Sequence, residues 1–335
     1  MRKALIVGIN SYIEEGIPNL SGTHNDVDRI GSLLKYHTGC DGEQNRPNFN
    51  CKVMKCKPLD EESSQEEIEK GITRAKLQGE IRNLFEDDES DIALLYFSGH
   101  GYENSLGGYL VTQDAKQYQQ GVSFNDIMIY ANNSSIKEII IILDCCRSGS
   151  LSYMPMVKHP MSTLRKGVSI LTSSNSEQES LEFKKQGVFT NLICNALSGG
   201  NTDILGNVKL THLYEHVDKM LGPWDQRPTF KSNSSRLSVL RKVKPKIDYA
   251  TLKRITKHFK SSRWSYRLDP SYDADFKLGH THNERIMKDL RQYYRLGLLY
   301  TTDVEYMYHA AEGYHSCKLT DVGRLYWKLV KNECI

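Results

Sequence analysis

The sequence predicts an α/β fold, in which a mostly parallel sheet has helices on both faces and is followed by a small α+β domain. The first observation is the apolar run at residues 139–143, which is rich in β-branched side chains and typical of a strand buried on both faces. A similar run occurs at residues 92–97. The third observation is that such strand patterns alternate with helical patterns, which favours parallel strands joined by helices.

Strands and helices can be assigned in order along the chain. Runs of apolar, β-branched residues between turn residues indicate strands, and apolar residues that recur every three or four positions indicate helices. We expect strands at residues 3–9, 92–97, 109–112, 139–143 and 168–174, and an edge strand at 237–240. We expect helices at residues 25–35, 73–85, 189–197 and 210–221, another that begins at Ser123, and an irregular polar region at 36–70.

A charged stretch with a proline, at residues 243–248, predicts a linker between two domains. The 335 residues are enough for two domains, which we place at 1–242 and 249–335. The second domain holds ten of the 19 tyrosines. Helical patterns at 283–296 and after Thr320, with a hairpin-like stretch between them, predict a winged-helix-like domain that recruits a substrate or a regulator.

Composition indicates a cytoplasmic protein. The mean hydropathy is −0.53, the apolar runs are too short to span a bilayer, and the N-terminal run has no cleavage site of a signal peptide. Eight scattered cysteines in such a chain favour reduced thiols. The net charge of +3 is concentrated in residues 245–335, which carry 16 basic against 11 acidic side chains. This modest excess leaves a nucleic-acid partner open without favouring it.

No metal or other cofactor is expected. Cys40, Cys51 and Cys56 lie near His37, but they lack the paired C-x-x-C spacing of a zinc site, so we interpret them as loop thiols. The acidic cluster at residues 86–91 lacks the regular alternation of a calcium loop and is more typical of a solvated turn. Activation by calcium therefore stays open but unsupported.

A histidine and a cysteine follow the two apolar runs. His100 comes after the run at 92–97 and is flanked by glycines, and Cys146 comes after the run at 139–143. Open α/β sheets place reacting groups at the carboxyl ends of their strands, where a thiol and an imidazole form a nucleophile with its base. The alternative is that both are inert core residues, which is common for buried cysteines.

Residues 97–101 and 144–149 together resemble the caspase-like cysteine proteases, in particular their metacaspase and bacterial caspase-homologue branch. The histidine precedes the cysteine by 46 positions, close to the roughly 50 found in caspases. The resemblance covers about residues 1–242 and implies a caspase-like fold. Further segments that resemble the family occur at residues 7–10, 20–26, 187–190 and 226–228.

The resemblance also implies residue roles. Cys146 would be the nucleophile, since Cys145 occupies a position where the family usually has serine or alanine, and His100 would be the base and acid. The N–H groups of Gly101 and Cys146 would form the oxyanion hole. No third catalytic residue is indicated.

Substrate specificity is implied by two carboxylates. The family's acidic pocket positions correspond to Asp26 and Asp144, which would favour arginine or lysine at P1. Alternatively, Asp26 only caps a helix, or it does both. Ser173 and its neighbours would pair with an extended substrate. Residues 150–166 would be an inter-subunit linker, and Lys158, Arg165 and Lys166 would suit self-cleavage; activation without processing is equally open.

The sequence thus predicts a cysteine endopeptidase that cleaves after basic residues, by family analogy in a prokaryotic signalling or antiviral defence pathway. One alternative is a non-catalytic caspase-homologue scaffold. Another is a protease tethered to DNA through a basic helix face, although a solvated amphipathic helix gives the same pattern and is favoured. The residues of that face are Arg285, Lys288, Arg291 and Arg295.

Overall fold

The structure is a computed structural model. It describes residues 1–14, 16–38, 46–59, 62–87, 89–104, 107–116, 119–148, 164–173, 188–221, 227–272 and 281–335, with the backbone alone at 119–120 and 146–148. The chain divides into two compact units, one of residues 1–202 and 207–244 and the other of residues 203–206 and 245–335. Residues 243–248, expected to be a linker, contribute buried Val243 to the core of the first unit and Ile247 to that of the second.

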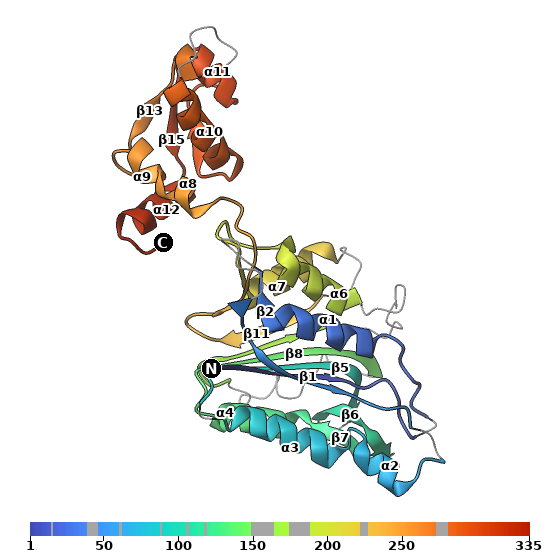
Figure 1. The fold of residues 1–335 in the computed structure, drawn as a ribbon. Helices are drawn as coiled ribbons and strands as arrows, with labels where there is room; N and C mark the ends of the chain where they lie inside the picture. The colour runs from blue at the N-terminus through green and yellow to red at the C-terminus, as the bar shows by residue number, and fades with distance from the viewer. Residues whose placement is uncertain are drawn as a thin grey trace. The chain divides into compact units, whose positions relative to one another are not determined.

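The first unit is built on one large sheet with the strand order β11-β9-β8-β5-β1-β4 (Figure 1). The strands are β1 (Arg2–Gly8), β4 (Asn50–Lys55), β5 (Ile92–Asn104), β8 (Glu138–Ser148), β9 (Val168–Thr172) and β11 (Thr229–Asn233). All neighbours in this order run parallel except β11, which is antiparallel to β9. Beyond β5 the sheet continues through antiparallel β6 (Gly107–Lys116) and β7 (Gln119–Ser123).

Helices cover both faces of this sheet (Figure 1). One face packs against α1 (Thr23–Lys35), α6 (Val188–Asn195) and α7 (Leu210–Met220), and the other against α3 (Arg74–Phe85) and α4 (Phe124–Asn133). The β8 isoleucines show why both faces need cover: Ile140 belongs to the first cluster and Ile141 to the second. The predicted mostly parallel sheet with helices on both faces is confirmed.

Several smaller elements complete the first unit. They are α2 (Gln65–Lys70), the five-residue π-helical turn η2 (Ala196–Gly200), and two short two-stranded sheets: β2 (Tyr36–His37) with β3 (Arg46–Pro47), and β10 (Asn207–Lys209) with β12 (Val239–Lys242). No helix in the described part of the chain is long and apolar enough to cross a membrane.

Three predictions about elements are wrong. The helix expected at residues 25–35 begins at Thr23 with Gly22 as its N-cap, so Asp26 lies in the first turn and does not cap it. The region 36–70, expected to be irregular, contains β4 and α2. The edge strand expected at 237–240 is β12, which pairs with β10 outside the main sheet, and the actual antiparallel edge is β11.

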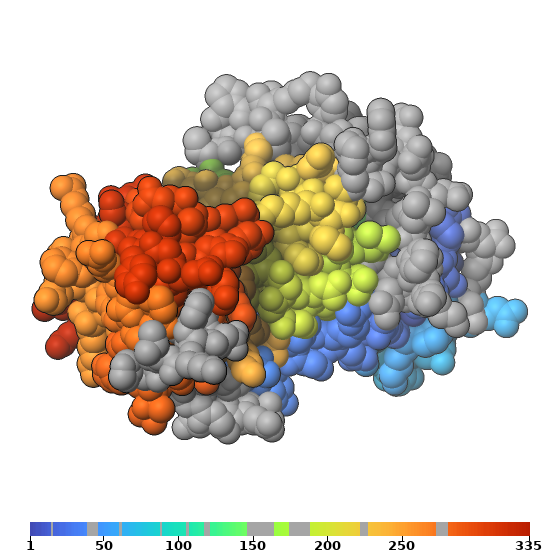
Figure 2. Space-filling view, turned by 90° about the horizontal axis from the view of Figure 1, so that it is seen from above, coloured from blue at the N-terminus to red at the C-terminus, as the bar shows by residue number. Residues whose placement is uncertain are grey.

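The second unit combines short helices with a three-stranded antiparallel sheet of order β13-β15-β14 (Figure 1). Figure 2 shows its orange and red side chains as a closely packed body. A helix, α11, lies between β14 and β15, and the winged-helix likeness stays a prediction. The elements are α8 (Tyr249–Lys253), α9 (Ile255–His258), β13 (Ser265–Arg267), the 3-10 helix η3 (Pro270–Tyr272), α10 (Thr281–Arg295), β14 (Leu299–Thr301), α11 (Met307–Glu312), β15 (Ser316–Leu319) and α12 (Asp321–Lys331).

Candidate active site

The carboxyl ends of the central strands β5 and β8 bring the predicted histidine and cysteine together. These strands are parallel neighbours over eleven residue pairs, and their register sets His100 opposite Cys146 and Ser98 opposite Asp144. Because side chains alternate along a strand, positions 144 and 146 of β8 share one face and position 145 belongs to the other. The sheet therefore unites two residues that lie 46 positions apart in the sequence.

Cys145 lies in a different environment. Its side chain is 5% exposed and belongs to the hydrophobic cluster on the α3 and α4 side of the sheet. The side chain of Cys146 lies outside the described residues, so its place is given by the backbone register alone. Of the two adjacent cysteines, only position 146 lies opposite His100.

Two hydrogen bonds fix His100. Its ring nitrogen Nε2 lies 2.8 Å from the carbonyl oxygen of Pro18. Since a carbonyl oxygen only accepts, Nε2 carries the proton, and the neutral ring keeps its lone pair on Nδ1. The backbone N–H of His100 donates to the hydroxyl of Tyr12 at 2.9 Å, and that hydroxyl donates to the carbonyl of Ile9 at 3.0 Å. Neither Tyr12 nor the Pro18 carbonyl was found from the sequence.

Burial favours the neutral form of this imidazole. Desolvation lowers the pKa of His100 below its ordinary value of 6.5, while the hydrogen bond to the Pro18 carbonyl opposes the shift. The ring also packs against the ring of Tyr12, with centroids 5.0 Å apart. A neutral imidazole with a free lone pair is the form that can accept a proton from a thiol.

The loop that carries Pro18 is itself held in place. The N–H of Leu20 donates to the Asn10 carbonyl at 2.9 Å, and the N–H of Tyr12 donates to Oδ1 of Asn19 at 3.1 Å. Close approach of this loop requires Gly99, because a Cβ there would lie 3.1 Å from the Tyr12 hydroxyl and 2.9 Å from the Phe97 ring. The glycine beside His100 thus has a packing role.

The predicted pocket carboxylates lie on the sheet face that α1 and α6 cover. Asp26, which is 2% exposed, accepts a long hydrogen bond of 3.4 Å from the hydroxyl of Ser98, the residue opposite Asp144 in the register. Burial raises the pKa of Tyr96, and the negative charges of both carboxylates raise it further. The structure therefore brings Asp26 and Asp144 to one neighbourhood, beside the position of Cys146.

A hydroxyl relay supports Asp144. Thr190 of α6 donates its Oγ1 proton to Oδ2 of Asp144 at 2.5 Å, so the hydroxyl of Tyr96 must donate in turn to Thr190. Burial raises the pKa of Asp144 above 3.8, and the hydrogen bond from Thr190 opposes that shift. Thr190 lies in the segment 187–190 that resembles the family, but its role was not predicted.

The remaining predicted residues are placed as follows. Gly101 is buried in β5 opposite Leu110 of β6. Ser173 follows β9 directly, and its N–H donates to the carbonyl of Leu143 at 2.9 Å. Since β11 pairs with β9 as far as Thr172, Ser173 lies just beyond the part of that edge that β11 covers. Residues 149, 174, 187 and 226 lie outside the described residues.

The predicted linker is described only at its end. Residues 150–163, which include Lys158, lie outside the described part of the chain. The guanidinium of Arg165 donates to the carbonyls of Ala131 at 2.8 Å and Ile136 at 2.5 Å, which anchors it to the end of α4. Lys166 is exposed. An anchored arginine is a poor site for self-cleavage, whereas Lys166 is accessible.

Candidate metal ligands have other partners. Cys56 is buried and contacts His24 at 3.4 Å, while His37 accepts a hydrogen bond from the N–H of Lys242; Cys40 lies outside the described residues. Within the described residues no cluster of three or more potential ligands could hold a metal ion. In the acidic stretch 86–91, three carboxylates pair with cations: Glu86 with Arg82, Asp87 with Lys3, and Asp91 with Lys137 and the N-terminal amine.

The fold and this geometry define the class of the protein: an α/β protein with a candidate thiol site at the carboxyl edge of its sheet. The caspase-domain family model matches residues 1–240, which is most of the chain. The chain therefore belongs to the caspase-domain family of cysteine peptidases, as its resemblance predicted. Membership of a peptidase family implies protein substrates.

Solved structures similar to this chain share little sequence with it. Caspase-1 from Spodoptera frugiperda is 18% identical, with 72% of this chain and 90% of that chain covered and a TM-score of 0.48. A protein from Geobacter sulfurreducens is 14% identical, with 72% and 97% covered and a TM-score of 0.49. No curated protein sequence matched the chain.

Proposed function

We propose that this protein is a cysteine endopeptidase that cleaves protein substrates after arginine or lysine, with Cys146 and His100 as its catalytic dyad. The observation that carries the proposal is the register of β5 and β8, which sets His100 opposite Cys146 at the carboxyl edge of the sheet. The described environment of His100 supports it, because that imidazole is half-buried, its pKa is lowered by desolvation, and it is oriented by the Pro18 carbonyl.

The proposed reaction proceeds through an acyl-enzyme. Nδ1 of His100 takes the proton of the Cys146 thiol as the sulfur attacks the scissile carbonyl carbon, and the N–H groups of Gly101 and Cys146 bind the oxyanion. The imidazolium then gives its proton to the departing amine as the C–N bond breaks. A water molecule, deprotonated by the same imidazole, attacks the thioester and releases the carboxylic acid product and the thiol.

The preference for a basic P1 residue rests on Asp144 and Asp26. Asp144 is partly accessible, is hydrogen-bonded by a neutral hydroxyl, and has no cationic partner among the described residues. A partly desolvated carboxylate with no cation is costly to ionise, and an incoming guanidinium or ammonium would reduce that cost. In the proposal Asp26 supplies the second carboxylate of the pocket. Its negative charge also interacts favourably with the positive N-terminus of α1.

Fluorogenic peptides that end in arginine, lysine or aspartate test the proposal, with calcium present or chelated. The wild type is compared with Cys146→Ala and with the matched control Cys145→Ala. We expect turnover of the basic peptides without calcium, lost in the first variant and retained in the second. Turnover of the aspartate peptide would overturn the pocket assignment but keep the dyad, whereas loss of activity in Cys145→Ala alone would overturn the nucleophile.

The setting of the enzyme rests on family analogy. We infer a cytoplasmic protease of a prokaryotic signalling or defence pathway, with the C-terminal unit recruiting a substrate or regulator. A chain that turns over none of the three peptides, yet binds a protein partner equally well as wild type and as Cys146→Ala, would instead be a non-catalytic scaffold.

A further inference from the structure

The C-terminal unit contains a cavity of about 590 Å³ that is separate from the site described above. One wall is formed by α8 and α9 and the other by the first three turns of α10. All of its walls belong to the second unit. The lining residues are Asp248, Thr251, Arg254, Lys257, His258, His282, Arg285, Ile286, Lys288, Asp289 and Gln292.

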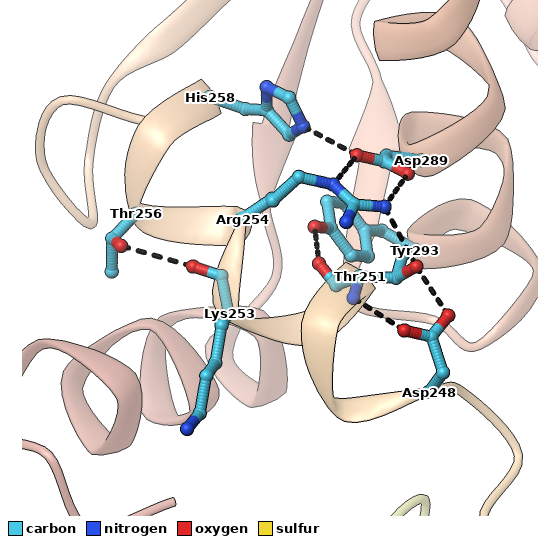
Figure 3. A network of polar contacts seen from close by, with 8 residues as sticks. All are labelled: Asp248, Thr251, Lys253, Arg254, Thr256, His258, Asp289 and Tyr293. Carbon is cyan, nitrogen blue, oxygen red and sulfur yellow. Dashed lines mark hydrogen bonds and ion pairs between the residues drawn. The ribbon is translucent and has the colours of Figure 1, made fainter.

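Both carboxylates that line the cavity already accept hydrogen bonds from other residues of the chain. Asp289, which is 6% exposed, accepts two hydrogen bonds from the guanidinium of Arg254, at 2.6 and 2.7 Å, and one from His258 at 2.9 Å (Figure 3). Asp248 caps α8 and accepts from the N–H and the hydroxyl of Thr251. These bonds lower the pKa of each carboxyl, although burial alone would raise that of Asp289.

The other cations of the cavity have no such partner. Among the described residues, no acidic side chain pairs with Lys257, Arg285 or Lys288, and Nη1 of Arg254 has no hydrogen-bond acceptor. Arg285 and Lys288 lie three positions apart on α10 and so share one face of that helix, with Lys257 on α9 across the cavity. The histidines aside, the four cations and two carboxylates leave a charge of +2.

Like charges that converge on a concave site repel one another until an anion enters. We propose that this cavity binds a small ligand that carries phosphate groups, with Arg285, Lys288 and Lys257 contacting the phosphate oxygens and the Arg254–Asp289 pair holding the wall in place. Guanidinium groups bind phosphate oxygens bidentately, and lysines add point charges, so this donor set suits a phosphate better than a single carboxylate.

A small ligand fits better than a nucleic-acid duplex. The cavity has the size of a small-molecule site, whereas a duplex needs an extended basic surface. Arg295, the exposed last basic residue of α10, is not among the lining residues and would belong to such a surface. The inference does not depend on the peptidase proposal, since it uses residues of the second unit only.

Calorimetric titration of the full chain with inorganic pyrophosphate, at constant ionic strength, tests the site. The double variant Arg285→Gln/Lys288→Gln removes two exposed cations of the cavity, and Arg295→Gln is the matched control on the same helix. We expect one saturable site in the wild type, an affinity at least tenfold weaker in the double variant, since a charged hydrogen bond contributes about tenfold or more, and a change below twofold in the control. No saturable binding, or an equal loss in the control, would overturn the proposal.

A footprint distinguishes the cavity from a general basic surface. Lysines are acetylated briefly with and without pyrophosphate, and the extent at each is measured by mass spectrometry. We expect pyrophosphate to slow acetylation of Lys257 and Lys288 and to leave the exposed Lys331 of α12 unchanged. Equal protection of all three lysines would place the anion elsewhere.

Discussion

The two units each hold a carboxylate that is at least partly shielded from water, and the two differ in the partner that the chain provides. Asp289 in the second unit receives a guanidinium and an imidazole, and its pKa is lowered. Asp144 in the first unit receives a neutral hydroxyl from Thr190, and its pKa is raised by burial. A carboxylate with a built-in cation stabilises its own fold, whereas one held by neutral donors is available to a cation from outside.

The histidines of the two units differ in the same way. His258 donates to the carboxylate of Asp289, while His100 donates to the uncharged carbonyl of Pro18. Without an adjacent carboxylate, nothing offsets the burial that lowers the pKa of His100 except this one hydrogen bond. The first unit thus keeps an imidazole without an ionic partner and a carboxylate without a cation, which are the groups that the proposed basic-specific peptidase would need.

The largest expected effect is that of Asp144→Asn on catalysis. Asparagine keeps the shape and the hydrogen bond from Thr190 but cannot pair with a cationic P1 side chain. We expect kcat/KM for arginine peptides to fall by about 100-fold, because losing one partner of a buried charge pair costs roughly 2–5 kcal/mol. Asp289→Asn, the equivalent change in the second unit, should leave kcat/KM unchanged. Equal kcat/KM of wild type and Asp144→Asn would show that Asp144 does not pair with the P1 side chain.

The next effect is that of Asp289→Asn on stability. Arg254 and His258 would lose their anionic partner, and we expect the second unit to be less stable by about 2 kcal/mol, near the middle of the range for a charged hydrogen bond because the Arg254 side chain is 39% exposed. Hydrogen exchange of amides in α8 and α10 measures this as roughly 30-fold faster exchange. The same experiment on Asp144→Asn should show no loss of protection in β8; faster exchange there would give Asp144 a structural role.

The sequence predicted the sheet because its central strands are apolar without interruption. Residues 92–97 and 139–143 can be buried only if helices cover both faces, and this requirement alone indicates a parallel α/β sheet. β11 was missed because its residues are mostly exposed or polar and its strand form depends on pairing with β9. α1 was placed too late because Asn25-Asp26 resembles a cap, although Gly22 permits an earlier start.

The candidate site was predicted as residue types but not as a network. His100 and Cys146 follow from motifs at strand ends, Asp26 and Asp144 follow from the family resemblance, and the structure brings these positions together. The Pro18 carbonyl is a backbone atom, so no residue type signals it. Thr190 supports Asp144 from 46 positions away, and such a contact can be found only after the packing of α6 on the sheet is known.

The dependence of stability on pH should have opposite signs for the two carboxylates. Asp289, with a lowered pKa, contributes stability that is present above its unfolded value near 3.8 and is lost as the pH falls through its folded pKa. Asp144, with a raised pKa, costs stability as the pH rises from 3.8 through its folded pKa. Denaturant unfolding between pH 3 and 7 measures the free energy of unfolding. As the pH rises, we expect Asp144→Asn to become more stable relative to wild type and Asp289→Asn to become less stable relative to wild type. Parallel curves of stability against pH for the two variants would contradict the opposite pKa shifts of the two carboxyl groups.

The smallest effect expected is that of Tyr12→Phe, which tests how His100 is held without an ionic partner. The Tyr12 hydroxyl accepts the backbone N–H of His100, so its removal should loosen the imidazole without touching the substrate. We expect kcat to fall about fivefold with KM unchanged, the size of one neutral hydrogen bond, and the alkylation of the catalytic thiol to slow to the same degree. Tyr130→Phe is the control, because that hydroxyl is hydrogen-bonded to Gln78 of α3, away from the site. A change in KM alone would show that Tyr12 shapes the substrate pocket and does not position the base.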